Sequence, residues 1–278
     1  MTTEEIAQAF LVKPSAIAQR IVRAKARIRE AGIAVELPSR SELPERLGAV
    51  LHVIYLLFNE GYEPTYGPSL TRVDLCAEAI RLAYLVVDIL PEPEVYGLLA
   101  LMTFHHARMG TRTSPTGELV PLESQDRSRW NREEIARAQT FLKRALLLGQ
   151  MGRFTCEASI AALHAEAPSA QDTNWQLIVQ LYNALLTTDP SPIVRLNRAV
   201  AIAMRDGPAA GLTIINEILA EGSLAEYRFA HAARADMYRR LGRNEQARSA
   251  YETALSMTRQ DVERRFLLGR LSEVTGSG

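Results

Sequence analysis

The chain has 278 residues, of which 47% are apolar and 23% are charged, values typical of a globular protein rather than a disordered or fibrous one. Its 32 basic side chains balance its 32 acidic ones, which excludes a global attraction to nucleic acid or to an anionic membrane. Cys76 and Cys156 form no CxxC pair, and no apolar run or leader pattern indicates a membrane segment. We therefore expect a soluble, cytoplasmic protein that makes no membrane contact.

The first thirty residues predict two short helices joined by a turn at residues 11–13. Thr3 suits the cap of the first helix, and Pro14 suits the first turn of a second helix that runs to Arg29. Five apolar side chains are expected to form a small core: Ile6, Phe10, Ile17, Ile21 and Ile28. Charge is segregated, because residues 1–30 hold six Lys or Arg against three Glu, a balance of +3 that leaves −3 for the remainder.

One face of the second predicted helix carries the side chains expected to contact DNA, which are Lys13, Ser15, Gln19, Arg20 and Arg23. Basic side chains there neutralise phosphates, whereas Gln19 and Arg20 have the length and donors to reach base edges in the major groove. A basic helix that merely faces solvent is the alternative interpretation.

Residues 32–46 contain Pro38 and Pro44 and predict a linker between the N-terminal element, residues 1–31, and a large all-α domain, residues 47–278. In that domain an apolar stripe predicts a helix from Leu47 to a break at Gly61, and a second stripe predicts a helix from Leu70 to Val87. Further helices are expected at 94–109, 132–148, 155–165, 174–186, 192–205, 208–220, 226–241 and 244–257.

The last two expected helices carry the spacing of a 34-residue tetratricopeptide unit, with small or aromatic residues at Ala235, Tyr238, Gly242, Ala247, Tyr251 and Ala254. A fainter copy lies upstream, at Val200, Ala203, Gly207, Leu212, Asn216 and Leu219. We therefore expect stacked helix pairs, which need about three units to bury their faces.

A long loop from Gly110 to Trp130 is rich in Thr, Ser, Pro and Gly, and loops of this length in a compact domain are functional or mobile. We expect its charged end to order against carboxylates of the preceding helices and to form a protein-docking patch or a structural salt-bridge network. The residues of this polar cluster are Glu60, Asp74, Glu78, Arg81, Asp126, Arg127, Arg129 and Trp130.

Other residue types that could carry chemistry have simpler explanations. His105 and His106 are adjacent, so on a helix they point about 100° apart and cannot ligate one metal from one face, even with Glu123 or Asp126 nearby. Cys76 lies among apolar residues and is expected to be a core residue rather than a nucleophile. No P-loop, nucleophile elbow or dinucleotide fingerprint occurs. We predict neither enzyme activity, nor a metal, nor a cofactor.

The order of residues in both parts resembles a known family. Residues 2–7 and 19–25 resemble region 4.2 of extracytoplasmic-function (ECF) sigma factors, the part that reads the −35 promoter element. Residues 58–62, 74–82, 125–130, 196–201 and 231–236 look like the extension of the subgroup with a tetratricopeptide-like C-terminal domain. The resemblance covers nearly the whole chain. It implies a transcription initiation factor whose partners are promoter DNA, core RNA polymerase and a regulatory protein.

The chain differs from that family in one respect. It begins inside region 4.2, so region 2 and the earlier helices of region 4 have no counterpart in it, and we expect a truncated sigma factor. A stand-alone tetratricopeptide-like scaffold without a DNA role is the alternative.

Overall fold

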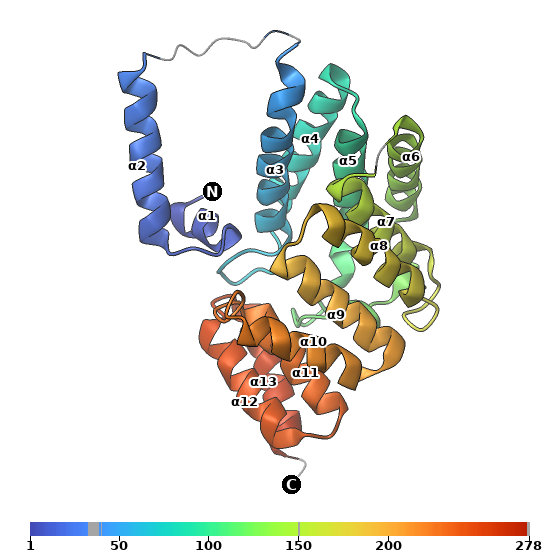
Figure 1. Cartoon of the computed structure of the whole chain (residues 1–278). Helices are drawn as coiled ribbons and strands as arrows, with labels where there is room; N and C mark the ends of the chain where they lie inside the picture. Colours follow the sequence, from blue (N-terminus) through green and yellow to red (C-terminus); the bar gives the residue numbers. More distant parts are fainter. Residues whose placement is uncertain (33–38, 40, 150, 277–278) are drawn as a thin grey trace.

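The computed structural model describes residues 1–32, 39, 41–149 and 151–276, and these form thirteen α-helices and three 3-10 helices (Figure 1). The helices are α1 Thr3–Ala9, α2 Pro14–Glu30, α3 Leu43–Tyr62, α4 Val73–Ile89, α5 Pro93–Ala107, η1 Met109–Thr111, η2 Leu122–Ser124, η3 Arg127–Arg129, α6 Arg132–Leu148, α7 Arg153–Glu166, α8 Trp175–Thr188, α9 Pro192–Asp206, α10 Pro208–Ala220, α11 Arg228–Arg240, α12 Asn244–Met257 and α13 Asp261–Thr275. Across those residues only two isolated β-bridges occur and no strand, so the all-α prediction is confirmed.

Helix α5 is the centre of a first bundle formed by α3 to α7. Its side chains are apolar all round rather than on one stripe, as expected of a helix that neighbours enclose. Val95, Leu98 and Met102 are fully buried, and they share one core with Phe58 of α3 and Ala138 of α6. Gly97 lets α7 approach closely, because a Cβ atom there would lie 2.6 Å from the backbone N of Thr155.

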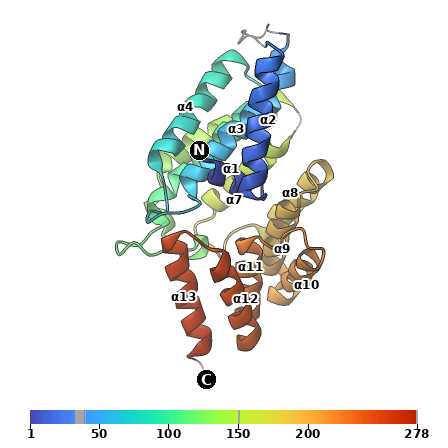
Figure 2. The same ribbon diagram turned by 90° about the vertical axis from the view of Figure 1, so that its left-hand side faces the viewer.

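Helices α8 to α13 continue the chain as antiparallel pairs, and α10 to α13 lie beneath the bundle in both views (Figures 1 and 2). Glycine makes the turn within each of two pairs, with φ of 98° at Gly207 and 69° at Gly242. Four of the predicted repeat positions are buried in one core: Ala235, Ala247, Tyr251 and Ala254. The expected paired arrangement of these helices is therefore present.

The start of α13, the last helix of this stack, contacts the connection between α3 and α4. The side-chain amide of the buried Gln260 donates to the carbonyl of Ser69 at 3.0 Å, and the backbone N–H of Asp261 donates to the carbonyl of Gly67 at 3.2 Å. Both acceptors lie in the connection between α3 and α4. Two hydrogen bonds thus fix the end of the stack to the connection before α4.

Several helix bounds differ from those expected from the sequence. Helix α3 begins at Leu43, so the last residues of the predicted linker are helical, while residues 33–38 and 40 lie outside the described part of the chain. The same helix continues through Gly61, whose missing side chain admits the next helix: a Cβ atom there would lie 2.8 Å from the Sγ of Cys76. Helix α13 was not expected at all.

The N-terminal helix pair forms as predicted but with a different core. Ala7 and Ile17 are buried, whereas Phe10 and Ile28 are 46% and 53% exposed. Phe10 instead packs beside His52 of α3, with ring centroids 5.8 Å apart. The apolar surface of a two-helix unit is too small to enclose large side chains, so part of it is covered by the neighbouring bundle.

No helix in the described residues has the length and apolar character needed to cross a membrane.

Candidate functional site

The face of α2 that was predicted to contact DNA is open to solvent. Lys13, Ser15, Gln19, Arg20 and Arg23 are all exposed. Pro14 at the first position starts the helix, and the tight turn before it needs a left-handed residue, which is Leu11 with φ of 51°. The arrangement is a helix, a short turn and a longer helix whose basic side chains face outward.

Helix α1 connects this pair to the rest of the protein. A capping box formed by Thr2 and Glu5 starts α1, rather than the Thr3 cap that the sequence suggested. Glu5 is 4% exposed, and its carboxylate accepts a hydrogen bond from Arg72 at 3.0 Å. It also accepts from the hydroxyl of Tyr66 at 3.5 Å. One carboxylate thus both caps the helix and fixes it to the connection before α4.

The charged row on α4 is a surface feature. Glu78 and Arg81 form a two-point pair in which both N–O distances are 2.7 Å, and hydrogen bonding from Arg81 holds the pKa of Glu78 below its usual value. Asp74 is exposed one turn before them. Solvent screens an exposed i,i+3 pair of this kind, so it adds little to stability and its charged groups stay at the surface.

Glu60 belongs to a separate, buried arrangement. Its carboxylate accepts from the hydroxyl of Thr65 at 2.7 Å and from the Thr65 backbone N–H at 3.1 Å. Arg72 lies 3.9 Å away, and burial raises the pKa of Glu60 above its usual value. These contacts order the connection between α3 and α4, which is a structural role.

The loop after α5 is folded, but its charged end does not contact the carboxylates of the preceding hairpin. Arg127 is 6% exposed and donates to the carbonyls of His164 at 2.6 Å and Ala167 at 2.8 Å, and to the hydroxyl of Thr173 at 3.3 Å. The expected contact with Asp74, Glu78 and Glu60 is therefore wrong. Arg127 instead holds the connection between α7 and α8.

The remaining members of the predicted cluster divide between interior and surface. Trp130 is 3% exposed and lies under the Arg127 guanidinium, whose carbon is 5.2 Å from the indole centroid. Asp126 and Arg129 are exposed. Asp126 accepts from the hydroxyl of Ser128 at 2.6 Å and from its backbone N–H at 3.0 Å, which caps η3, and these hydrogen bonds lower the pKa of its carboxyl. The eight residues thus do not form one composite patch.

The adjacent histidines face different neighbours, as the helical geometry required. The ring of His105 lies 5.2 Å from that of Tyr62, whereas Nδ1 of His106 lies 2.8 Å from a carboxylate oxygen of Glu134. Burial lowers the pKa of His105 well below its usual value. The described residues hold no group of three or more His, Cys, Asp or Glu arranged to bind a metal ion.

Both cysteines are buried in the protein interior. Burial raises the pKa of Cys76 to about 12 and that of Cys156 to about 11, so both stay protonated near neutral pH. The Sγ of Cys156 donates to the carbonyl of Leu181 at 3.2 Å. Both thiols therefore act as small core groups.

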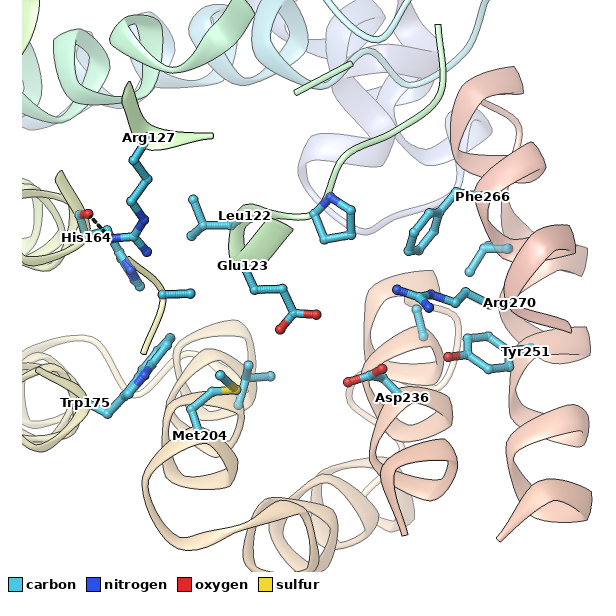
Figure 3. A pocket seen from close by; sticks show the side chains of 15 residues that line it. Leu122, Glu123, Arg127, His164, Trp175, Met204, Asp236, Tyr251, Phe266 and Arg270 are labelled. Atoms are coloured by element: carbon cyan, nitrogen blue, oxygen red, sulfur yellow. Dashed lines mark hydrogen bonds between the residues drawn. The ribbon is translucent and has the colours of Figure 1, made fainter. Parts of the chain in front are cut away.

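A cavity of about 290 Å³ lies between the loop after α5 and the inner side of the C-terminal helices (Figure 3). No residue pattern in the sequence indicated this cavity. Its apolar wall includes Leu122, Trp175, Met204 and Phe266, which come from η2, α8, α9 and α13. Its charged and polar lining includes Glu123, Arg127, His164, Asp236 and Arg270. Of these, only Arg127 belonged to the predicted cluster.

Comparison with known proteins gives two matches. Residues 46–146, which run from α3 to α6, match a family model described as a family of unknown function (DUF6596). A protein of Rhizobium meliloti (strain 1021) described as uncharacterized protein R00370 is 42% identical over 275 residues. That match covers 99% of this chain and 64% of the relative. The chain is thus similar along nearly all its length to part of a longer bacterial protein, and the segment from α3 to α6 is similar to that family of unknown function.

Proposed function

We propose that the chain is the C-terminal part of an ECF-type sigma factor, in which α1 and α2 read promoter DNA and the helical domain contacts core RNA polymerase or a regulatory protein. The observation that carries the proposal is the open basic face of α2, on which Lys13, Gln19, Arg20 and Arg23 are all exposed. The resemblance to region 4.2 is the reason for proposing that this face recognises DNA.

The electrostatics of α2 support a DNA-binding role. The first thirty residues have a balance of +3 within a chain of zero net charge, so positive potential is concentrated on this one element. Lys13 and Arg23 lie where phosphates would be neutralised, and Gln19 and Arg20 where base edges would be read. The Glu5–Arg72 contact engages α1 and leaves this face of α2 uncovered.

Protein contacts are proposed for the exposed part of the polar cluster. Asp74, Glu78 and Arg81 on α4, and Asp126 and Arg129 on the loop, remain at the surface. Partly exposed charges of this kind set orientation and association rate more than affinity. We propose no catalytic activity for the chain, and a cytoplasmic location fits the role.

The DNA role is tested with the full chain and fluorescence anisotropy of a labelled duplex, first selected from random sequences by the protein. Arg20→Ala combined with Arg23→Ala should weaken binding at least about ten-fold, because the double variant removes one proposed base contact and one proposed phosphate contact. The lost phosphate contact should also reduce the log–log salt slope by about 0.9. Gln19→Ala should instead relax the preference for the selected sequence.

The matched control removes two exposed cations elsewhere. Lys143→Ala combined with Arg144→Ala, on α6, changes net charge equally and should leave binding within about two-fold. Equal losses in the two double variants, or binding indifferent to salt, would refute the DNA role and favour a scaffold protein.

A further inference from the structure

Two arginines near the cavity have no carboxylate partner. Arg127 donates to carbonyl and hydroxyl oxygens only. Arg108 donates to Nδ1 of His105 at 3.1 Å. Within the described residues neither guanidinium has a carboxylate oxygen within 4.0 Å, and Asp172 and Glu63 act on them only over longer distances. A buried cation without an ionic partner is costly, so the charge at this end of the cavity is uncompensated.

Neutral side chains beside these arginines have unused hydrogen-bonding atoms. Nδ1 of His164, which lines the cavity, is buried and has no partner among the described residues. The indole N–H of Trp130, next to Arg127, is also buried and has no hydrogen-bond partner among the described residues. Burial, together with Arg108 and Arg127, lowers the pKa of His164 to about 4, so its ring is neutral near pH 7. Buried polar atoms are normally paired, so the unpaired Nδ1 of His164 at the cavity wall lacks a partner that a ligand could supply.

The opposite end of the cavity is already neutralised. Asp236 and Arg270 lie across the cavity from Arg127 and His164 (Figure 3). Asp236 accepts from Arg239 at 2.6 Å, and Arg270 lies 2.9 Å from Glu273. Glu123 is exposed, so solvent screens its carboxylate. The cavity therefore has one cationic end, a middle in which the Glu123 carboxylate lies beside apolar side chains, and a balanced far end (Figure 3).

We propose that this cavity binds a small amphipathic anion, namely a carboxylate with an aromatic or branched apolar body. The carboxylate lies at the Arg127 and His164 end, and the apolar body lies against Trp175 and Met204. The planar guanidinium matches a carboxylate in geometry. A cavity of about 290 Å³ lies at the small end of known ligand sites, which suits a compact acid. This inference goes beyond the proposed DNA role and does not depend on it.

The test is isothermal titration calorimetry of the full chain with 2-naphthoate and with the neutral 2-naphthalenemethanol, which have the same ring system. The acid should bind one-to-one and at least about ten-fold more tightly than the alcohol, since only the acid compensates the buried charge. Arg127→Gln keeps an amide that can donate to the carbonyls of His164 and Ala167 but removes the charge. This variant should weaken the affinity for the acid at least about ten-fold and change the affinity for the alcohol less than about three-fold.

Two further variants separate cavity binding from surface binding. Met204→Trp fills the cavity and should weaken both ligands at least about ten-fold, whereas Leu268→Trp, at an exposed site on α13, should weaken neither. If circular dichroism shows that Arg127→Gln is unfolded, Arg108→Met is used instead. This variant should lower the affinity for the acid and leave the affinity for the alcohol unchanged. Undetectable binding of the acid at millimolar concentration, equal affinity for acid and alcohol, or binding indifferent to Met204→Trp would overturn the proposal.

Discussion

Gly211 tests how closely α9 and α10, the two helices of one pair in the C-terminal stack, approach each other. Replacement by Ala would normally stabilise a helix by about 1 kcal/mol, because Ala loses less backbone entropy than Gly. In this fold the new Cβ atom would lie 2.5 Å from the Cβ of Ala203 and 2.6 Å from the carbonyl O of Ala199. Both contacts are about 1 Å shorter than van der Waals separation, and they involve atoms on or next to the backbone, so α9 and α10 must move apart.

Overpacking of this kind costs typically 1 to 3 kcal/mol, and the backbone contact places Gly211→Ala near the upper value. After the gain in helix propensity is subtracted, we expect a net loss of about 2 kcal/mol. At roughly 2 to 4 °C per kcal/mol for a protein of this size, the melting temperature should fall by about 4 to 8 °C.

Gly269 provides the matched control for this measurement. It lies inside α13, it is exposed, and nothing lies within 4 Å of a Cβ atom placed there. Gly269→Ala should therefore raise the melting temperature by about 2 to 4 °C. Thermal melts of the two variants, followed by circular dichroism, check the prediction. A Gly211→Ala variant as stable as Gly269→Ala would refute the close approach of α9 and α10.

Three other perturbations have clear expected outcomes. Tyr251→Ala should cost about 3 to 5 kcal/mol in urea unfolding, because the ring is 2% exposed, and a loss under about 1 kcal/mol would contradict its packing. Arg127→Glu should cost about 3 to 5 kcal/mol, whereas Arg129→Glu at the surface should cost under about 0.5 kcal/mol, and comparable melts would show that Arg127 is not anchored. Because the pKa of His164 in the folded protein, about 4, is below its usual 6.5, the unfolded chain takes up the proton first. Stability should thus fall by about 3 kcal/mol between pH 6.5 and pH 4, and His164→Leu should flatten that part of the pH profile of unfolding.

The sequence predicted helices well where local signals mark both ends. The bounds of α6, α10 and α12 agree with the expected residues. Asn131 caps α6, and Pro208 begins α10 directly after the turn at Gly207. Helix α13 was missed because its inward side is partly charged. Glu263 of that helix is buried through a pair with Arg228, with N–O distances of 2.9 and 3.0 Å. From sequence alone an acidic residue is expected at the surface, because nothing nearby identifies a partner that lies 35 residues away.

The candidate sites also differ in how far the sequence could predict them. The DNA-facing residues of α2 could be identified because they lie on one helix, where spacing alone decides which side chains share a face. The role of Arg127 could not be predicted, because its partners are backbone carbonyls near the end of α7, which no residue pattern marks. The cavity takes its lining from η2, η3 and six of the helices from α7 onward, so each lining residue looks ordinary within its own segment.

The contact of Gln260 with the connection between α3 and α4 affects the order in which the protein can assemble during synthesis. In a linear repeat stack each unit contacts only its neighbours and can form as soon as it is made. Here the amide of Gln260 and the carbonyl of Ser69 are 191 residues apart. At about 5 to 20 residues per second, that connection leaves the ribosome roughly 10 to 40 s before its partner. Arg72 in the same connection binds Glu5 of α1. The set of contacts that orders this connection, and through it holds α1, is therefore complete only after residue 260 has been synthesised.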